Sequence, residues 1–358
     1  MKRILCCVLS VVIALVCVSA CAEDGRFILS GKPETSIPIR KDYGNNPVVS
    51  GVSSTTGLPA SGEEYTPIVM VLDNAEDAHP HWGISQADIL FQVPNAGKGA
   101  TKLLALFADR YPEQAGGARS ARATMLPVAT SWGAAFAYAG GPSLKSSYVD
   151  VDTLLKKWKM TGKMSYNLLG NKFKERVDFV DSPHNLSCHV REIHEYLVEK
   201  KVKFTERPFL FTDTPLSRGD DVSTFEVRHY GDSKEGHDNP ASRSSFAYDS
   251  SRSAYIRSNS SGEFIDRDTG KPVLFSNVVI LVVGIKWAEG YLYLSKHMTG
   301  SGAAEIFQNG KHIEGAWARS KDTGRLVLLD ENGKELEMQR GKSFFIITND
   351  VTEVICTP

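Results

Sequence analysis

The pattern of apolar residues changes near Asp213, and this change constrains the fold more than any other feature of the chain. Before it, short apolar runs such as 67–72 alternate with segments of helical spacing. After it, strand candidates are separated by turn dipeptides such as Asn309-Gly310, with hardly a helical stretch. We therefore expect an α+β or α/β N-terminal domain with a mixed sheet over 65–213, followed by a β-rich C-terminal domain over 214–358.

The first 21 residues predict export. Lys2 and Arg3 precede an apolar run from Ile4 to Val18, which is too short for an ordinary membrane span, and small residues then stand before Cys21. The arrangement resembles the bacterial lipobox, in which residues 1–20 are the signal peptide and Cys21 becomes the lipidated first residue. The alternative is an ordinary secretory signal that is cut and discarded, with Cys21 incidental. Both predict an extracytoplasmic protein.

Residues 22–64 are rich in Gly, Ser, Thr and Pro and lack sustained apolar periodicity. The composition is loosest at 51–57. Such segments behave as flexible linkers. We expect 21–64 to tether the folded part to the membrane through the lipid on Cys21.

Composition limits the classes of partner and cofactor. The chain has 41 basic and 42 acidic residues and a net charge of -1, so nothing in its charge favours nucleic acid, whose binding depends on phosphate contacts. No glycine-rich phosphate loop is present, and we expect no cofactor. Cys188 and Cys356 remain in the folded part, and we expect idle thiols, although their pairing stays open.

Arg119, Ser120 and Arg122 follow Gly116-Gly117 and form the most suggestive motif. If a helix starts there, the two guanidinium groups share one face beside the free N–H groups of the first turn. Such a place suits a carboxylate or phosphate. The alternative is a pair of structural salt bridges to carboxylates such as Asp73 or Asp88.

Other polar residues lie where sheets of this class place ligands. Asp73 and Asn74 follow an apolar run, and Asp88 adjoins another, although Asp and Asn also cap loops. In the loop 182–185, His184 could act as a general base beside Asn185, but a lone loop histidine is more often a surface or packing residue. Gly140-Gly141 leaves room for close approach of a ligand.

Two further patterns are weaker. Asp77, His79 and His81 could face a metal, but no spaced set of ligands completes a site, so we expect none. Cys188 stands next to His189, yet adjacent side chains diverge, which disfavours a thiol hydrolase.

The motifs, in this order, resemble those of the YerB-like lipoprotein family, which has a lipobox, a tether and two domains of unassigned function. The resemblance covers nearly the whole chain from about residue 65. The matching segments are Pro67–Asn74, Gly83–Ile89, Gly117–Arg122, Pro183–Asn185, Phe246–Asp249, Tyr255–Arg257, Asn277–Ile280, Gly315–Trp317 and Gly341–Lys342.

The chain departs from the family pattern at three places. The family has Glu where Gln92 stands, Glu-Gly where Ala96-Gly97 stands, and Thr-Arg where Thr101-Lys102 stands. If those glutamates are catalytic in relatives, this chain lacks the carboxylate pair.

We therefore expect a membrane-anchored envelope lipoprotein that binds an anionic cell-wall ligand in a cleft of the N-terminal domain. Arg119 and Arg122 would hold the anion, and Asp73, Asp88, His184 and Asn185 would order the surrounding hydrogen bonds. One alternative is an envelope hydrolase or transferase that uses His184 or the pair Asp73/Asp88. Another is an assembly factor whose C-terminal domain docks a protein partner through a strand edge.

Overall fold

The computed structural model describes residues 26–29, 34–144, 146–229, 243–350 and 352–358. The predicted signal peptide and the lipidation site Cys21 lie outside the described residues. In the part that is described, no helix is both long and apolar enough to cross a membrane.

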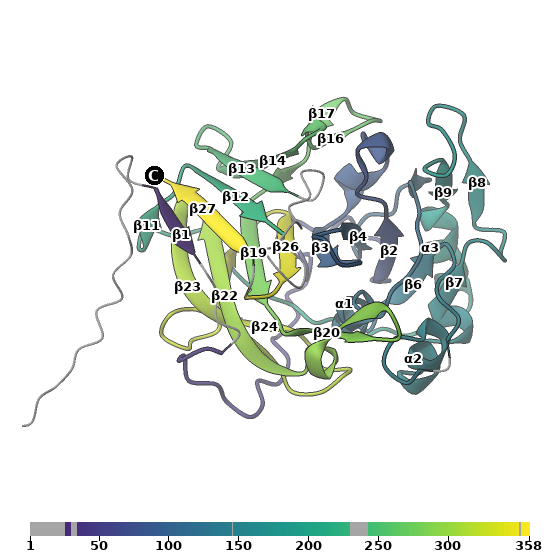
Figure 1. Ribbon diagram of the computed structural model, residues 1–358, viewed down its shortest axis with the longest axis horizontal. Coiled ribbons are helices and arrows are strands. Elements are labelled where there is room, and N and C mark those ends of the chain that lie inside the picture. Colours follow the sequence, from purple (N-terminus) through teal and green to yellow (C-terminus); the bar gives the residue numbers. More distant parts are fainter. Residues whose placement is uncertain (1–25, 30–33, 145, 230–242, 351) are drawn as a thin grey trace, which may run out of the picture.

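A central mixed sheet runs through the whole molecule (Figure 1). Its strands follow the order β11 (Asp220–Asp221), β23 (Lys311–Arg319), β22 (Gly300–Gln308), β19 (Asn277–Val282), β26 (Ser343–Thr348), β3 (Ile89–Pro94), β4 (Thr101–Phe107), β2 (Ile68–Leu72), β6 (Ala135–Tyr138) and β7 (Ser165–Asn167), with β24 (Val327–Leu329) beside β23.

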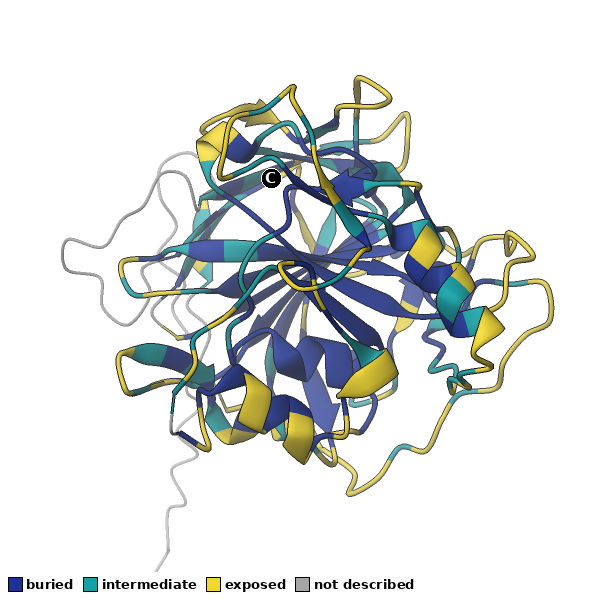
Figure 2. Cartoon of the chain, turned by 90° about the vertical axis from the view of Figure 1, so that its right-hand side faces the viewer, coloured by how far each residue is buried: buried dark blue, intermediate teal, exposed yellow. Residues whose placement is uncertain are grey.

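Both faces of the central sheet are buried, which explains the continuous apolar runs in its strands. In β2, Val69 and Val71 face one core, whereas Ile68, Met70 and Leu72 face the other. In Figure 2 the inner strands, such as β3 and β26, are accordingly buried along their length, while the helices expose their outer faces. Burial of such a side chain contributes about 1.5 to 3 kcal/mol.

Three α-helices cover the N-terminal half of the central sheet. Helices α1 (Leu126–Trp132) and α2 (Val151–Lys157) pack on one face, and α3 (Val190–Glu199) packs on the other. Helix α3 buries Val190, Ile193 and Leu197, whose spacing places them on one face of a helix.

A second sheet covers the C-terminal half of the central sheet. Aromatic side chains fill the space between the two sheets, as in the stacked rings of Phe225 and Phe307, whose centroids are 3.8 Å apart. The order of its strands is β1 (Phe27–Leu29), β27 (Glu353–Thr357), β12 (Thr224–Arg228), β13 (Ser244–Asp249), β14 (Ala254–Asn259) and β15 (Gly262–Glu263), with β18 (Leu274–Phe275) beside β14.

Several small sheets of two or three short strands lie outside the two large sheets. They are β5 (Ala115–Gly116) and β8 (Lys174–Arg176) on either side of β9 (Leu186–Cys188), β10 (Leu210–Thr212) with β25 (Glu337–Gln339), β16 (Ile265–Asp266) with β17 (Lys271–Pro272), and β20 (Ile285–Ala288) with β21 (Tyr291–Leu294). Single 3-10 turns form at Glu76–Ala78, Ile84–Gln86, Gly162–Met164 and Ser295–Met298.

The expected architecture is confirmed: an α/β N-terminal part with a mixed sheet precedes a β-rich C-terminal part. The sheet is nevertheless continuous between them. Strand β26 comes from the end of the chain and lies parallel to both β19 and β3, so that Ser343 is paired with Asn277 on one side and Ile89 on the other.

The expectation of a flexible tether over 21–64 is wrong at two stretches that pack against the folded part. Strand β1 is paired with β27 in the second sheet. Residues 53–56, in the stretch that appeared loosest, are buried, and Thr55 donates a hydrogen bond to Asp88. These residues are small and hydroxylated, and their hydroxyl groups hydrogen-bond to buried polar atoms, as in the pair Ser53 and Thr55.

Candidate functional site

Asp73 is the centre of the site that the structure assembles. It immediately follows β2, it is 1% exposed, and its backbone N–H donates to the carbonyl of Gly117. Its Oδ1 accepts hydrogen bonds from the backbone N–H groups of Asn74 (2.9 Å) and Ala75 (3.3 Å). These backbone N–H groups therefore orient the carboxylate independently of the side chains that pair with it.

Two cations pair with this carboxylate. Lys102 Nζ lies 2.6 Å from Oδ1, and Arg119 Nε donates to Oδ2. Burial opposes ionisation of Asp73, but the charges of Lys102 and Arg119 outweigh it and hold the pKa of Asp73 far below its usual range. Asp73 is therefore a permanent anion at neutral pH.

Arg119 reaches Asp73 from an extended segment. Its backbone N–H donates to the carbonyl of Val71, and its carbonyl accepts from the N–H of Ala139. The segment 117–121 is thus held between the ends of β2 and β6. The expected helix start at this point is wrong: the helix begins only at Leu126, where Pro127 suits its first turn.

Arg122 therefore does not share a helical face with Arg119, but it lies in the same cluster. Its guanidinium group repels the Lys102 ammonium, as does that of Arg119. Burial lowers the pKa of Lys102, and these two arginines add to the effect, although Asp73 opposes it. Arg122 Nη1 donates to the carbonyl of Ala121, and its Cζ lies 5.8 Å from the centroid of the Tyr291 ring.

His184 completes the set around Asp73. Its Nδ1 donates to Asp73 Oδ2 at 2.8 Å. The loop approaches closely because Gly117 has no side chain: a Cβ there would lie 2.0 Å from the carbonyl oxygen of His184. Asn185 lies one step away, where it accepts a hydrogen bond from Arg176 and donates to the carbonyl of Val177, so it orders the loop without contacting Asp73.

Ser120, Gly140 and Gly141 line the same segment. Ser120 Oγ donates to the carbonyl of Ala139, and the carbonyl of Gly140 accepts from the N–H of Ala121. Gly140 has φ +75°, a conformation that favours glycine. These residues therefore support the arginine segment through the backbone.

Asp88 does not belong to this site, which corrects the expectation that it orders bonds around the anion. It precedes β3, whereas Asp73 follows β2, and these strands run in the same direction on either side of β4. The two carboxyl groups therefore lie at opposite ends of the sheet. Asp88 Oδ2 accepts from Thr55 Oγ1 and from the backbone N–H groups of Ala108 and Asp109. Burial raises its pKa to about 6.

Asn74 points into a buried polar network. Its Nδ2 donates to Thr101 Oγ1 at 2.8 Å, and its Oδ1 lies 3.4 Å from Nη2 of Arg257. Gln92 also contacts both Thr101 and Arg257. Sequence reasoning missed Lys102 and Arg257 as site residues, and noted Lys102 and Gln92 only as departures from a family pattern.

The histidines His79 and His81 and the two cysteines are packed as structural residues. His81 Nε2 donates to the carbonyl of Asp73 at 2.7 Å, and the ring of His79 is edge-on to it. Within the described residues, no group of three metal-ligating side chains converges. Cys188 and Cys356 are both free and buried, and burial raises the pKa of each thiol, as expected for idle cysteines.

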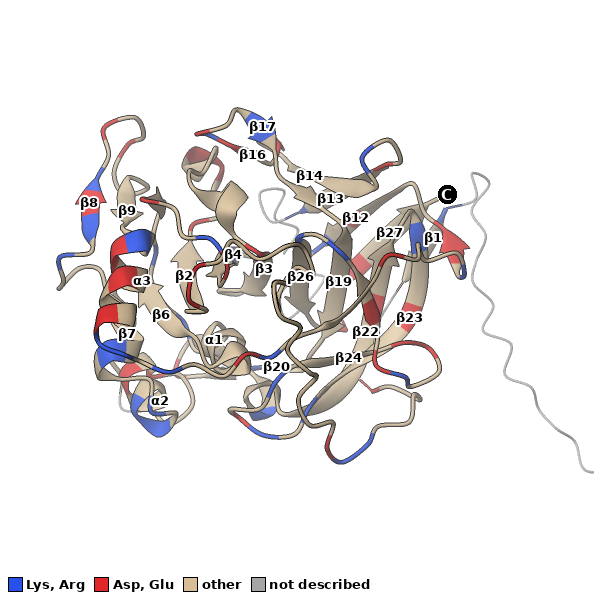
Figure 3. Cartoon of the chain, turned by 180° about the vertical axis from the view of Figure 1, so that it is seen from behind, with Lys and Arg blue, Asp and Glu red and all other residues tan. Residues whose placement is uncertain are grey.

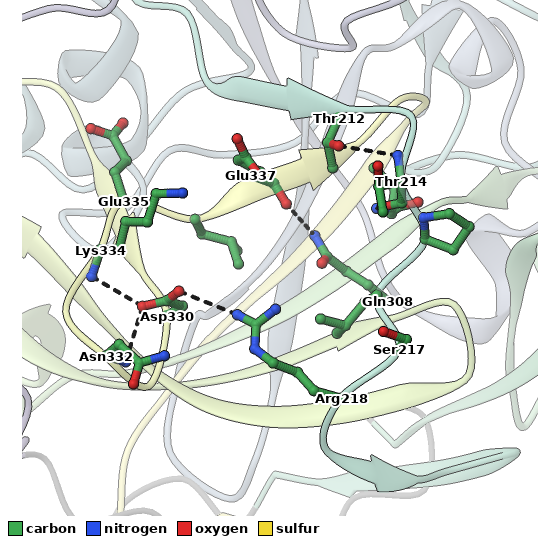
Figure 4. Close-up of a pocket in the computed structure, with 14 residues that line it drawn as sticks. Thr212, Thr214, Ser217, Arg218, Gln308, Asp330, Asn332, Lys334, Glu335 and Glu337 are labelled. Atoms are coloured by element: carbon green, nitrogen blue, oxygen red, sulfur yellow. Dashed lines mark hydrogen bonds and ion pairs between the residues drawn. The ribbon is translucent and has the colours of Figure 1, made fainter.

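A separate cavity of about 250 Å³ lies in the C-terminal part, lined by residues including Arg218, Gln308 and Asp330 (Figure 4). Two of its charged groups are paired with each other, since Arg218 Nη2 lies 3.2 Å from Asp330 Oδ2. This cavity shares no residue with the Asp73 site.

The site at Asp73 carries excess positive charge. Lys102 and Arg119 pair with a single carboxylate, and Arg122 is close enough to repel Lys102. Lys102, Arg119 and His184 keep 17%, 24% and 13% of their side chains exposed. Arg119 Nη1 donates to the carbonyl of Pro183 and Arg122 Nη1 to that of Ala121. Within the described residues, the Nη2 group of each arginine is left to bind a second anion. The arrangement can bind an anionic group from solvent.

Comparison with known proteins places the chain in a family. Its residues 55–203 and 237–345 match the N-terminal and C-terminal domains described as "Protein of unknown function (DUF3048)", and the chain belongs to this family.

Its relatives include the "Putative lipoprotein YerB" of Bacillus subtilis (strain 168), with 27% identity over 301 residues, which cover 83% of this chain and 86% of that protein. The crystal structure of the YerB protein from Bacillus subtilis matches with a TM-score of 0.69 and 25% identity over 85% of this chain and 99% of that chain. The resemblance drawn from the motifs is thereby confirmed.

Proposed function

We propose that this chain is an exported, membrane-anchored lipoprotein that binds an anionic component of the cell envelope at the Asp73 site. The ligand is a carboxylate of a peptidoglycan stem peptide or a phosphate group of a wall polymer. The lipobox-like segment ending at Cys21 and the name of the Bacillus relative support the anchoring. The excess of cations around Asp73 supports the binding and is the observation that carries it.

Arg122 is the residue on which the test depends. Arg119 is engaged by Asp73, whereas no carboxylate in the described parts of the chain contacts Arg122. Loss of one charged hydrogen bond costs about 1.5 to 3 kcal/mol, which is a fall in affinity of roughly ten- to a hundred-fold.

Calorimetric titration of the mature chain with purified wall fragments tests the proposal. Arg122→Ala weakens binding while the unfolding midpoint stays near that of the wild type. Arg218→Ala removes an arginine of the distant cavity and serves as the matched control, with unchanged affinity. Equal affinity of all three proteins would refute the assignment, and so would binding that does not weaken with added salt.

The anchoring is tested separately. In cells, Cys21→Ser moves the protein from the membrane fraction to the soluble extracytoplasmic fraction, because no acyl chain can then be attached. A chain that stays with the membrane after this change is anchored by something else.

Acid–base chemistry by His184 is a second candidate, favoured by its hydrogen bond to Asp73. A carboxylate that orients an imidazole is a common arrangement in hydrolases. In the described residues, however, no hydroxyl or thiol group is hydrogen-bonded to His184. Mass spectrometry of wall fragments after incubation separates the candidates: a hydrolase or transferase changes their mass and loses this activity in His184→Ala, whereas a binding protein returns them unchanged.

Docking of a protein partner through the C-terminal domain stays a prediction. The outer strand of the central sheet on that side is β11, whose Asp220 and Asp221 are exposed and acidic (Figure 3). In-cell cross-linking to residues beyond 213 would support it.

A further inference from the structure

Arg257 is a fully buried cation whose partners are all neutral. It lies on β14 with 0% of its surface exposed. Its Nε and Nη2 lie 3.2 and 3.0 Å from Ser244 Oγ, and Nη2 lies 3.4 Å from the side-chain oxygens of Asn74 and Gln92. The rings of Phe264 and Phe344 lie 4.9 and 5.3 Å from its Cζ.

The charge of this guanidinium group has no counter-ion among the described residues. No carboxylate there contacts it, and its Nη1 is buried without a hydrogen-bond partner. Burial lowers the pKa of Arg257 to about 9, so the group is still charged at neutral pH. A buried charge without a partner is strongly destabilising.

Arg319 shows how this chain otherwise buries a guanidinium group. It is 1% exposed, and burial lowers its pKa to about 9 as well. All three of its nitrogens nevertheless donate to oxygen atoms, including the carbonyl groups of Gly324 and His297. Arg257 lacks such a set.

Three imidazole groups around Arg257 also hold unpartnered nitrogens: Nε2 of His79, Nδ1 of His81 and Nε2 of His229. The ring centroids of His79 and His81 are 4.5 Å apart, and each lies 5.8 Å from the Phe264 ring that Arg257 also contacts. Burial lowers the pKa of His79 to about 2 and of His229 to about 3, and the charge of Arg257 adds to both effects. These rings are therefore neutral and can act as N–H donors.

We propose that Arg257 Nη1 and the N–H groups of His79 and His229 hold a small monovalent anion, of which chloride is the representative. The anion supplies the negative charge that no described side chain places beside Arg257. His81 is not a donor here, because its Nε2 proton goes to the carbonyl of Asp73 and leaves Nδ1 as an acceptor.

One of the three proposed donors, His229, borders a small void that neither Arg257 nor His79 lines. Thr101 and His229 line a void of about 10 Å³. A void of this volume holds about one water-sized species. Because Arg257 is 0% exposed and its Nη1 is buried, a phosphate or an organic acid from solvent does not reach it, and the buried anion is distinct in class from the envelope ligand proposed for the Asp73 site.

Gln92→Glu provides the decisive variant. Gln92 Oε1 already lies 3.4 Å from Arg257 Nη2, so a glutamate at this position supplies the missing charge from within the chain. Gln308→Glu is the matched control, because Gln308 is equally buried and its side-chain amide donates to the uncharged side chain of Asn277 and the backbone carbonyl of Glu337.

Thermal unfolding of the mature chain is measured from zero to 150 mM sodium chloride, with gluconate keeping the ionic strength constant. The wild type gains roughly 2 to 4 °C in a saturable manner. Gln92→Glu starts at a higher midpoint and gains nothing from chloride, whereas Gln308→Glu starts lower and keeps the chloride response. An equal chloride response in wild type and Gln92→Glu would overturn the proposal.

Crystals soaked in bromide locate the ion directly. An anomalous peak within hydrogen-bonding distance of Arg257 Nη1 supports the site, and its absence, with only water density there, refutes it. Arg122→Ala keeps the chloride response, so a failure of envelope-ligand binding and a failure of this proposal are distinguishable.

Discussion

Asp73 and Asp88 are two buried carboxyl groups at the ends of strands on either side of β4, yet their chemistry is opposite. Asp73 is paired with Lys102 and Arg119, which depress its pKa despite burial. Asp88 accepts its hydrogen bonds from neutral groups. Burial raises its pKa to about 6, although the positive charge of Lys342 acts in the opposite direction. Burial alone therefore does not determine the ionisation of a carboxyl group. The charge of its partners decides whether the group is a fixed anion or titrates near neutral pH.

The largest effect is expected from Asp73→Ala. Removing this anion leaves Lys102 and Arg119 next to each other without their counter-charge, which costs roughly 3 to 5 kcal/mol in the free energy of unfolding. Urea denaturation measures it. Asp77→Ala removes an exposed carboxylate from the following turn and serves as the control, with a change below about 0.5 kcal/mol. Similar losses in both variants would remove the distinction between Asp73 and an ordinary surface acid.

Asp88→Asn tests the other half of the comparison. Because folding raises the pKa of Asp88 from 3.8 to about 6, its favourable contribution is complete below pH 3.8 and is lost as the pH rises through about 6; the total corresponds to about 3 kcal/mol. Asp73 contributes with the opposite sign: its stabilisation is present above pH 3.8 and is lost as the pH falls below that value.

Denaturation midpoints measured between pH 4 and pH 8 check this difference. The wild type loses stability through the titration of Asp88, and Asp88→Asn removes that part of the pH dependence. An unchanged pH profile in Asp88→Asn would show that the carboxyl group is not the titrating group.

The smallest effect concerns the hydrogen bond from Thr55 to Asp88. Thr55→Val keeps the shape of the side chain and removes a 2.9 Å bond to the carboxylate, which costs about 1 to 2 kcal/mol above pH 6 and less below it. Ser61→Ala, in an exposed part of the same region, should cost less. A Thr55→Val protein as stable as the wild type would restore the view of residues 53–57 as a loose linker.

The sheet was predictable wherever a strand is buried on both faces. Runs such as Ile68–Leu72 read directly as strands because both cores need apolar side chains. The extended course of residues 117–121 was not predictable, because its hydrogen bonds come from β2 and β6, which are distant in the sequence. The packing of residues 53–57 was not predictable for a related reason. Their polar composition is typical of a flexible linker, and their buried partner Asp88 is distant in the sequence.

The candidate site was predictable in part. Asp73, Arg119 and His184 do come together, as hydrogen-bonding residues at one end of the sheet. Asp88 could have been separated from them, since it stands before its apolar run whereas Asp73 stands after one. Lys102 and Arg257 carry no local motif, and only the pairing of strands reveals that they are near Asp73 or Asn74.

The position of β26 has a consequence for how the chain reaches its native state. This strand is synthesised almost last, yet it fills the middle of the central sheet between β3 and β19. Until it arrives, each of these strands presents an open edge that can pair with the wrong neighbour. The sheet is therefore completed only at the end of translation. We expect a chain that stops before Ser343 to leave β3 and β19 each with an unpaired edge, and to be bound by chaperones or degraded by proteases.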